Sequence, residues 1–288
     1  MMVHAHPDDE SSLTGGTLAR YAAAGCRTVL VTCTDGGQGD AGPNLKPGQP
    51  GHDPRLVAAQ RSQELAQAAA LLGVHDVIKL GYPDSGVSAR PAPDSFSQRP
   101  VRPMLVRLVR LIRMYQPDVV ITYPPNGMSG HPDHIRTHDL VLAAHQNIIA
   151  NSEPAHHQPQ DAASASWGPQ LYYIALSRTR LRAAQDRARV AFGPQSWVPP
   201  DGMAVDDASI TTSIDVAAFR ADKLAALAAH ASQADAAALL QIFGAAADSA
   251  ESVEEYVRVY PVPPSPSIAV EVDFFGSAVV DRTSAATA

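Results

Sequence analysis

The chain has 288 residues, a hydrophobic fraction of 45%, a charged fraction of 18% and a formal net charge of -7. This composition is typical of a globular protein with a sizeable core, and it excludes a largely disordered chain. Because the charge is negative and no Lys/Arg-rich run is present, we expect no nucleic-acid partner and no membrane partner.

The location and the partner class follow from features that the sequence lacks. No apolar run reaches the roughly 18 residues of a membrane span, and no signal peptide is recognisable. Cys26 and Cys33 form neither a C-x-x-C pair nor a disulfide framework, which fits a reducing compartment. We therefore expect a cytoplasmic protein that acts on a small polar molecule. The oligomeric state is undecided, and a homo-oligomer stays open.

Strands and helices alternate along the first 150 residues. In chain order, the patterns predict strands at 1–5, 27–33, 76–80 and 118–123 and helices at 11–24, 57–72, 101–115 and 132–147. The first helix is expected to be capped by Ser11 or Ser12. Such alternation is typical of a parallel sheet with crossover helices, which binds ligands beyond the carboxyl ends of its strands. We predict an α/β, Rossmann-like, mostly parallel sheet with helices on both faces and the active site at the C-terminal strand ends.

The remaining segments complete the predicted organisation. Residues 35–54 and 81–99 are rich in Gly, Pro or Ser and are expected to be long loops of the kind that often carry function. After a polar, irregular segment at 151–168, we expect a strand at 171–176 and helices at 178–191 and 216–231. The chain is thus divided into a Rossmann-like catalytic core at 1–150, completing strands and helices of the same domain at 151–260, and an extended or disordered tail at 261–288.

Two short motifs carry the chemistry, HPDD at residues 6–9 and HPDH at residues 131–134, each directly after a predicted strand or the turn that follows one. A hydrolytic zinc ion usually has three ligands from His, Asp or Glu and keeps a position open for water. His6, Asp9 and His134 supply that set, although two histidines and a carboxylate also describe a Fe²⁺ site. Alone, each motif also fits a helix N-terminus or a solvated turn, but their joint occurrence favours a metal site.

The other motif residues are candidates for proton transfer. Asp8 and His131 are left beside the metal as acid/base groups. Asp133 is expected to hydrogen-bond to a ring nitrogen of His131 and to fix its orientation. The motifs therefore predict a hydrolytic centre in which three residues bind the metal and three assist the chemistry.

A family resemblance rests on the same residues. AHPDDE at 5–10 and NGMSGHPDHIRTH at 126–138 resemble the two signatures of the LmbE/PIG-L family of zinc de-N-acetylases, which act on N-acetylglucosamine-type sugars. The similarity is strong over residues 1–150, and KLAALAAHASQ at 223–233 is similar to a C-terminal His-x-Ser/Thr-Gln segment of the family. The resemblance implies the three zinc ligands named above, Asp8 as general base and His131 as its protonated partner. The implied products are acetate and a free amine.

Within that family the chain is most similar to the mycothiol branch, which contains cysteinyl-glucosaminyl-inositol deacetylases and mycothiol S-conjugate amidases. Arg61 and Asp84 align with positions that contact the sugar or inositol in those enzymes, and His230 is a further candidate for substrate contact. Ser129 stands where those enzymes tend to carry Tyr, and Gln38 stands at an acidic position.

Three functions are therefore compatible with the sequence. The first is a zinc-dependent hydrolase that removes the N-acetyl group from a glucosamine-containing small molecule. The second is a mycothiol S-conjugate amidase that cleaves the cysteinyl-glucosamine amide. The third, from another class, is a metal-containing sugar-binding protein without turnover.

Overall fold

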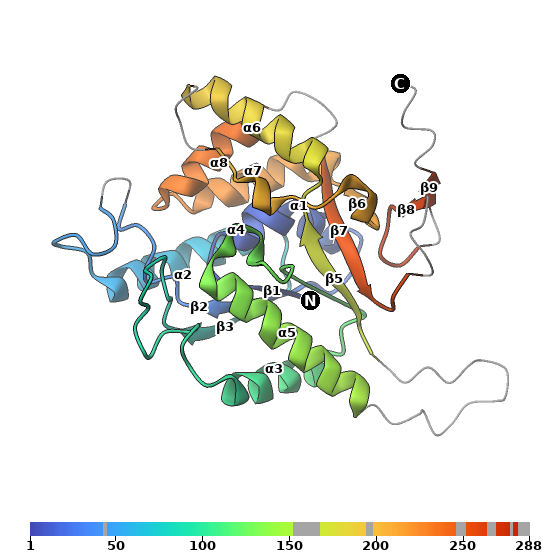
Figure 1. Ribbon diagram of the computed structural model, residues 1–288, viewed down its shortest axis with the longest axis horizontal. Coiled ribbons are helices and arrows are strands. Elements are labelled where there is room, and N and C mark those ends of the chain that lie inside the picture. The colour runs from blue at the N-terminus through green and yellow to red at the C-terminus, as the bar shows by residue number, and fades with distance from the viewer. Residues whose placement is uncertain are drawn as a thin grey trace.

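One open sheet organises the protein in the computed structural model (Figure 1). The structure describes residues 1–42, 45–151, 168–193, 198–245, 252–263, 269–276 and 279–281, and within them nine strands lie in the order β3-β2-β1-β4-β5-β7-β6-β8-β9. The first five strands of this order are parallel to one another. Beyond them, β7 pairs antiparallel with both β5 and β6. The predicted α/β class with a mostly parallel sheet is confirmed.

The elements of the described residues have the following bounds. The strands are β1 (Met2–His4), β2 (Val29–Thr34), β3 (Asp76–Tyr82), β4 (Val119–Thr122), β5 (Gln170–Ala175), β6 (Thr212–Asp215), β7 (Val253–Tyr260), β8 (Ala269–Glu271) and β9 (Val279–Asp281). The helices are α1 (Asp9–Ala23), α2 (Pro54–Leu71), α3 (Val101–Tyr115), α4 (Gly127–Gly130), α5 (Pro132–Ala150), α6 (Arg178–Phe192), α7 (Arg220–Ala229) and α8 (Ala234–Gly244). None of them is long and apolar enough to cross a membrane.

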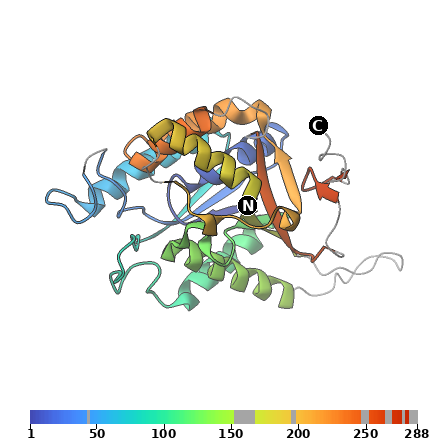
Figure 2. The same cartoon turned by 45° about the horizontal axis from the view of Figure 1, so that its top comes forward.

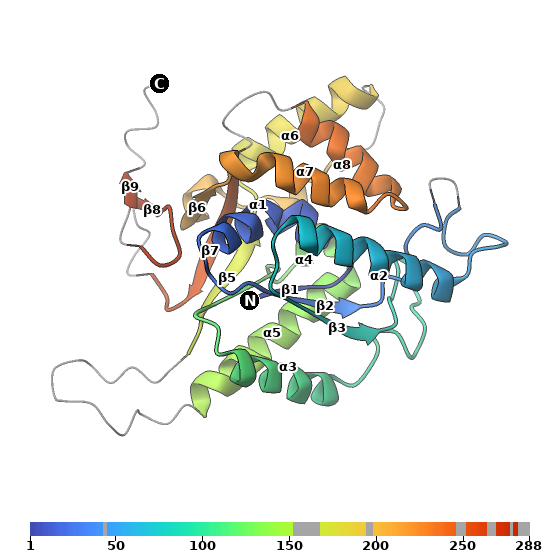
Figure 3. The same ribbon diagram turned by 180° about the vertical axis from the view of Figure 1, so that it is seen from behind.

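Helices cover both faces of the sheet. α3 and α5 pack together on one face, and α1, α2 and α7 pack on the other, as the three views show (Figures 1, 2 and 3). Successive residues of a strand pack on opposite faces of the sheet. Met2 and Ile121 belong to one core cluster, whereas Val3 and Val120 belong to the other. This alternation follows from the two-residue period of a strand. Both faces of the central strands are buried, and these strands are therefore mostly apolar.

The first helix begins two residues earlier than the expected Ser cap, so that part of the prediction is wrong. α1 starts at Asp9, and Asp8 occupies the N-cap position with φ 110°. Its backbone N–H donates to Glu10 Oε2 at 2.9 Å, and its carboxylate accepts a hydrogen bond from Arg61. Contacts with the rest of the fold therefore set this helix start, rather than a local Ser cap.

The C-terminal half holds more regular structure than expected. β6, β7 and α8 are absent from the prediction, although the β-branched and aromatic run of β7 is a recognisable strand signal. The tail from 261, expected to be extended or disordered, contains β8 and β9, whose extended backbone is paired in the sheet. Each of these two strands has only three residues, which are too few for a recognisable strand pattern. Pairing with neighbouring strands stabilises them instead. The irregular segment predicted at 151–168 lies almost wholly outside the described residues.

Candidate active site

The two motifs meet where the adjacent parallel strands β1 and β4 end. His6 Nδ1 lies 3.3 Å from His134 Nε2. The carboxylate of Asp9 joins them, with Oδ2 3.3 Å from His6 Nδ1 and Oδ1 3.4 Å from His134 Nε2. Ligands held about 2.1 Å from a tetrahedral zinc ion lie about 3.4 Å apart, so this spacing fits a divalent cation. The fold thus brings together the three residues that the motifs single out as ligands.

Hydrogen bonds on the far side of each ring set the two imidazole tautomers. His6 Nε2 faces Asp133 Oδ2 at 3.3 Å, and His134 Nδ1 lies 3.1 Å from the carbonyl oxygen of Gly127. Since both partners are acceptors, each imidazole carries its N–H on the nitrogen that faces the partner. The other nitrogen of each ring then keeps a lone pair for a metal ion. Those two lone pairs are the ones that face Asp9, which is the arrangement that a metal ion requires.

Two further sets of donor atoms surround His6. The atoms of His6, His131 and His134 lie within 4.8 Å of one another, as do those of His6, Asp84 and Asp133. The contacts of His6 Nε2 with Asp84 and Asp133, at 3.5 and 3.3 Å, are similar in length to those within the His6, Asp9 and His134 set. The described residues therefore form one His/Asp cluster that is able to hold a metal ion, with alternative sets that share His6.

Asp133 takes a different role from the one expected. Its carboxylate accepts the backbone N–H of Ser85 at 2.9 Å and faces His6, so the predicted hydrogen bond to the ring of His131 comes from the Asp133 backbone and not from its side chain. The ring of His131 instead caps α5, with Nδ1 accepting the backbone N–H of Asp133 at 3.2 Å. The cause is the helix start: Pro132 occupies the first turn, as predicted, and turns Asp133 inwards towards the metal cluster.

Asp8 is held beside the cluster in a strained backbone conformation. Its φ of 110° is one that residues other than glycine seldom adopt, at a typical cost of about 1–3 kcal/mol. Arg61 stabilises it: Nη2 donates to Asp8 Oδ2 at 2.6 Å and to the carbonyl of Pro7, and Nη1 donates to Gly36 O at 2.8 Å. Burial raises the pKa of Asp8 to about 8, while Arg61 opposes the rise. A divalent cation held by the cluster would lower that pKa.

His131 stands on the other side of the cluster. Its ring lies edge to face on His6, with centroids 4.6 Å apart. Burial lowers the pKa of His131 to about 4, and the neighbouring rings of His6 and His134 act in the same direction. The ring is therefore neutral near pH 7. Because Nδ1 accepts a backbone N–H, the proton of the neutral ring resides on Nε2.

A cavity of about 660 Å³ opens above the cluster. Both long loops line it, and so do Arg61 and Asp84, two of the residues predicted to contact substrate, together with Gln38 and Ser129. The carboxylates in the lining outnumber the cations: they are Asp8, Asp9, Asp40, Asp84 and Asp235, against Lys46 and Arg61. Electrostatics therefore favour a neutral or amine-bearing ligand over an anionic one.

His230, the third predicted substrate contact, lies elsewhere. It is fully buried, and its Nε2 is 2.7 Å from Glu10 Oε1. The residues that follow it brace the loops, since Ser232 donates to Glu64 and Gln233 pairs with the backbone of Asp40. The C-terminal segment thus supports α1 and the first loop, and of these residues Gln233 reaches the cavity.

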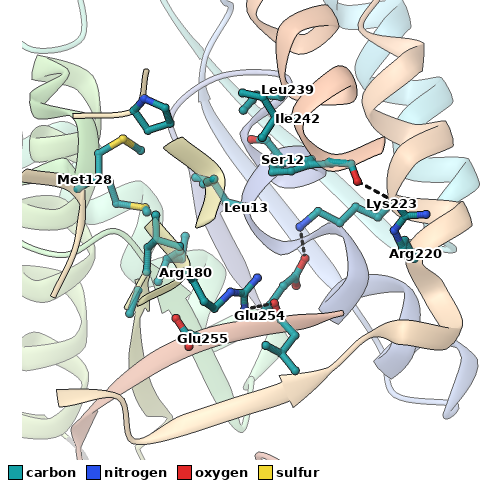
Figure 4. Close-up of a pocket in the computed structure, with 18 of the residues that line it drawn as sticks. Ser12, Leu13, Met128, Arg180, Arg220, Lys223, Leu239, Ile242, Glu254 and Glu255 are labelled. Atoms are coloured by element: carbon teal, nitrogen blue, oxygen red, sulfur yellow. Dashed lines mark hydrogen bonds and ion pairs between the residues drawn. The ribbon is translucent and has the colours of Figure 1, made fainter. Parts of the chain in front are cut away.

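A second cavity, of about 180 Å³, lies between α1, β5 and the helices α6 to α8 (Figure 4). Its lining is mostly apolar and contains no histidine and no thiol. The charged groups that Figure 4 labels are engaged: Lys223 Nζ donates to Glu254 Oε1 at 2.6 Å, and Arg220 donates to the carbonyl of Phe243 at 2.7 Å. This cavity offers no metal or proton chemistry, so of the two the cavity above the cluster is the candidate active site.

We expect Gly127→Ala to destabilise the protein more than Gly130→Ala. Both glycines have positive φ, 63° and 79°, so both substitutions carry the same backbone penalty of about 1–2 kcal/mol. An added Cβ at Gly127 would lie 2.8 Å from His134 Cβ and 2.9 Å from the backbone nitrogen of Ile135, whereas one at Gly130 meets nothing within 4 Å. Overpacking of this kind costs about 1–3 kcal/mol more. Urea unfolding of the metal-free variants measures the difference, and equal losses would contradict the close approach.

A convergent His/Asp/His set below a polar cavity, with a buried carboxylate beside it, defines the class of metal-dependent hydrolases. Comparison with known families narrows the class. Residues 1–145 match the family PIG-L, described as GlcNAc-PI de-N-acetylase, and the chain belongs to this family. One curated relative, the 1D-myo-inositol 2-acetamido-2-deoxy-alpha-D-glucopyranoside deacetylase of Acidothermus cellulolyticus, is 41% identical over 250 residues, which cover 81% of this chain and 78% of the relative. The protein is therefore an enzyme of the de-N-acetylase class, which hydrolyses carbon–nitrogen bonds other than peptide bonds.

Solved structures share the fold at lower identity. The N,N'-diacetylchitobiose deacetylase of Pyrococcus horikoshii superimposes with a TM-score of 0.58 at 20% identity, covering 92% of this chain and 86% of the other. A 4-carboxy-2-hydroxymuconate hydratase of Pseudomonas putida superimposes with a TM-score of 0.60 at 18% identity, covering 91% and 96%. Since a deacetylase and a hydratase share this fold, the architecture alone does not assign the reaction, and the site has to do so.

Proposed function

We propose that the protein is a zinc-dependent hydrolase that removes the N-acetyl group from a glucosamine-containing small molecule. The observation that carries the proposal is the convergence of His6 Nδ1, the Asp9 carboxylate and His134 Nε2 within 3.4 Å of one another. The names of the family and of the curated relative support the reaction type.

Zinc is the proposed metal because the set combines two imidazole nitrogens with one carboxylate oxygen and contains no thiolate. Fe²⁺ remains the competing metal for the same donors. When bound, the cation would lower the pKa of a water molecule and polarise the acetamide carbonyl. The residues around it perform the other tasks.

Asp8 is proposed as the general base. Its carboxylate lines the cavity, and the hydrogen bond from Arg61 holds it in one orientation. Asp8 accepts the proton of the attacking water and passes it to the leaving amine nitrogen, so that the amine leaves neutral and the carboxylate is regenerated.

His131 is proposed as the hydrogen-bond donor to the developing oxyanion. Its neutral ring carries the proton on Nε2, since Nδ1 is engaged in capping α5. A neutral donor performs this task without a change of protonation state. This refines the protonated role implied by the family resemblance. Asp133 and Asp84 support the ring of His6 rather than that of His131.

The substrate is proposed to be a neutral amino-sugar derivative. A cavity of about 660 Å³ fits a molecule of disaccharide size, and its excess of carboxylates disfavours phosphorylated ligands. Arg61 and Asp84 are placed to contact the sugar from the cavity wall, whereas the buried His230 positions Glu10.

We also propose that residues 1–260 form one domain. We propose a cytoplasmic location as well, which the two free thiols support.

The proposal is tested with the substrate of the curated relative, 1D-myo-inositol 2-acetamido-2-deoxy-alpha-D-glucopyranoside. We expect zinc-dependent release of acetate and free amine in equal amounts, and slower turnover of a phosphorylated analogue. A mycothiol S-conjugate is assayed in parallel, because preferred cleavage of its cysteinyl-glucosamine amide would replace the deacetylase by the amidase. Tight binding of both compounds without turnover would indicate a sugar-binding protein instead.

A further inference from the structure

We propose that Tyr123 is a positioning residue of the metal site, whose hydroxyl selects the oxygen of Asp9 that faces the cation and whose ring holds His134. The proposal deepens the function proposed above and rests on its ligand set. Tyr123 follows β4 directly, ahead of the second motif, and it is fully buried. It lies outside both sequence motifs and does not line the cavity above the cluster.

The hydroxyl of Tyr123 is tied to one oxygen of Asp9. It donates to Asp9 Oδ2 at 2.7 Å, and the backbone N–H of His6 donates to the same oxygen at 2.8 Å. Asp9 Oδ2 thus accepts two hydrogen bonds, which occupy its lone pairs. Oδ2 also lies 3.3 Å from His6 Nδ1, and Oδ1, which lies 3.4 Å from His134 Nε2, is left as the oxygen available to a cation. Asp9 is therefore held for coordination through a single oxygen.

The direction of the tyrosine proton is determined by its neighbours. The backbone N–H of Ala5 donates to the hydroxyl at 2.9 Å, so the single hydroxyl proton points elsewhere. His4 Nδ1 is 3.4 Å away, whereas the Asp9 carboxylate is much closer and charged. The proton of Tyr123 thus resides on the bond to Asp9.

The ring of Tyr123 positions a second ligand. It stacks on the imidazole of His134, with centroids 4.2 Å apart and an interplanar angle of 20°. The ring of His134 is also held by the hydrogen bond between its Nδ1 and the carbonyl of Gly127. One buried side chain therefore orients two of the three proposed ligands, and groups that orient ligands in this way typically change metal affinity about 10- to 100-fold when they are lost.

Tyr256 provides a matched control. It is also fully buried, and its hydroxyl also contacts a carboxylate, Glu254 Oε2 at 3.3 Å, together with Thr17 Oγ1 at 2.7 Å. None of its partners belongs to the metal cluster. Tyr123→Phe and Tyr256→Phe each remove one buried hydroxyl and keep the ring, so a general loss of packing or of a core hydrogen bond affects both variants.

The experiment measures zinc affinity by competition with a chromophoric chelator, alongside melting temperatures with zinc and with EDTA. We expect the zinc Kd of Tyr123→Phe to rise about 10- to 100-fold and its stabilisation by zinc to shrink, with both quantities unchanged in Tyr256→Phe. In the Co²⁺-substituted protein, Tyr123→Phe is expected to weaken the visible absorption bands, because Asp9 becomes free to coordinate through both oxygens.

The outcomes separate this inference from the function on which it rests. A zinc Kd and Co²⁺ spectrum of Tyr123→Phe equal to the wild type overturn the positioning role, even if the wild type deacetylates its substrate. Equal losses of zinc affinity in both variants overturn it as well, since they indicate a general structural effect. Failure of the proposed ligand set is recognised differently, because the wild-type protein then binds no stoichiometric zinc or binds it through one of the alternative sets that share His6.

Discussion

Replacing Asp8 with Asn is expected to lower kcat/KM by about 10²- to 10⁴-fold without changing the amount of bound zinc. Asn keeps the shape of the side chain and tolerates positive φ better than other residues, so the strained start of α1 survives. Its amide oxygen still accepts the hydrogen bond from Arg61, but it takes no proton from water. Steady-state acetate release and metal analysis of the same preparation give the two quantities.

Asp235→Asn serves as the control for Asp8→Asn. Asp235 lines the same cavity and is exposed, so its replacement removes an equal charge without touching the cluster. We expect it to retain most of the activity. If both substitutions reduce kcat/KM to the same extent, the effect is one of cavity charge, and Asp8 is not the base.

Asp9→Asn is expected to abolish stoichiometric zinc binding and, with it, deacetylation. The amide oxygen of Asn takes the place of Oδ2, because Tyr123 and the His6 backbone N–H both require an acceptor there. The NH₂ group then faces the cation, and an amide nitrogen has no lone pair to offer. The loss of zinc affinity is expected to exceed the about 10- to 100-fold typical of a supporting residue. Isothermal titration of the metal-free protein with zinc measures it.

His131→Asn is the partner experiment, since it introduces the same residue on the other side of the cluster. Asn is a good helix N-cap, so α5 keeps its start, while the Nε2 proton that faces the substrate is lost. We expect zinc binding as in the wild type and a large fall in kcat. The reverse pattern, in which His131→Asn loses zinc and Asp9→Asn keeps it, would identify His6, His131 and His134 as the ligand set.

The fold is predictable from the sequence where strands are buried on both faces. β1, β2 and β4 are buried and mostly apolar, and each lies where the pattern predicts it. The signal fails in the last third of the chain. β8 and β9 have three residues each, too few to show a period, and they form by pairing with each other and, for β8, with the distant strand β6.

Within the site, residue identity was easier to predict than residue contacts. The motif positions converge because parallel strands end at one edge, which sequence order reveals. The direction of Asp133 depends on where α5 starts, and the burial of His230 depends on how α7 packs against α1. Tyr123 was missed because a buried aromatic residue at a strand end has no sequence signal beyond that of the core. Contacts of this kind are properties of the packed structure.

The most direct test of the account is a crystal structure of the zinc-loaded protein with anomalous data collected at the zinc edge. We predict one strong anomalous peak about 2.0–2.2 Å from His6 Nδ1, His134 Nε2 and Asp9 Oδ1, with the cavity above it open to substrate. A peak between His6 Nε2, Asp84 and Asp133, on the opposite side of the His6 ring, would contradict the proposed ligand set and the mechanism built on it.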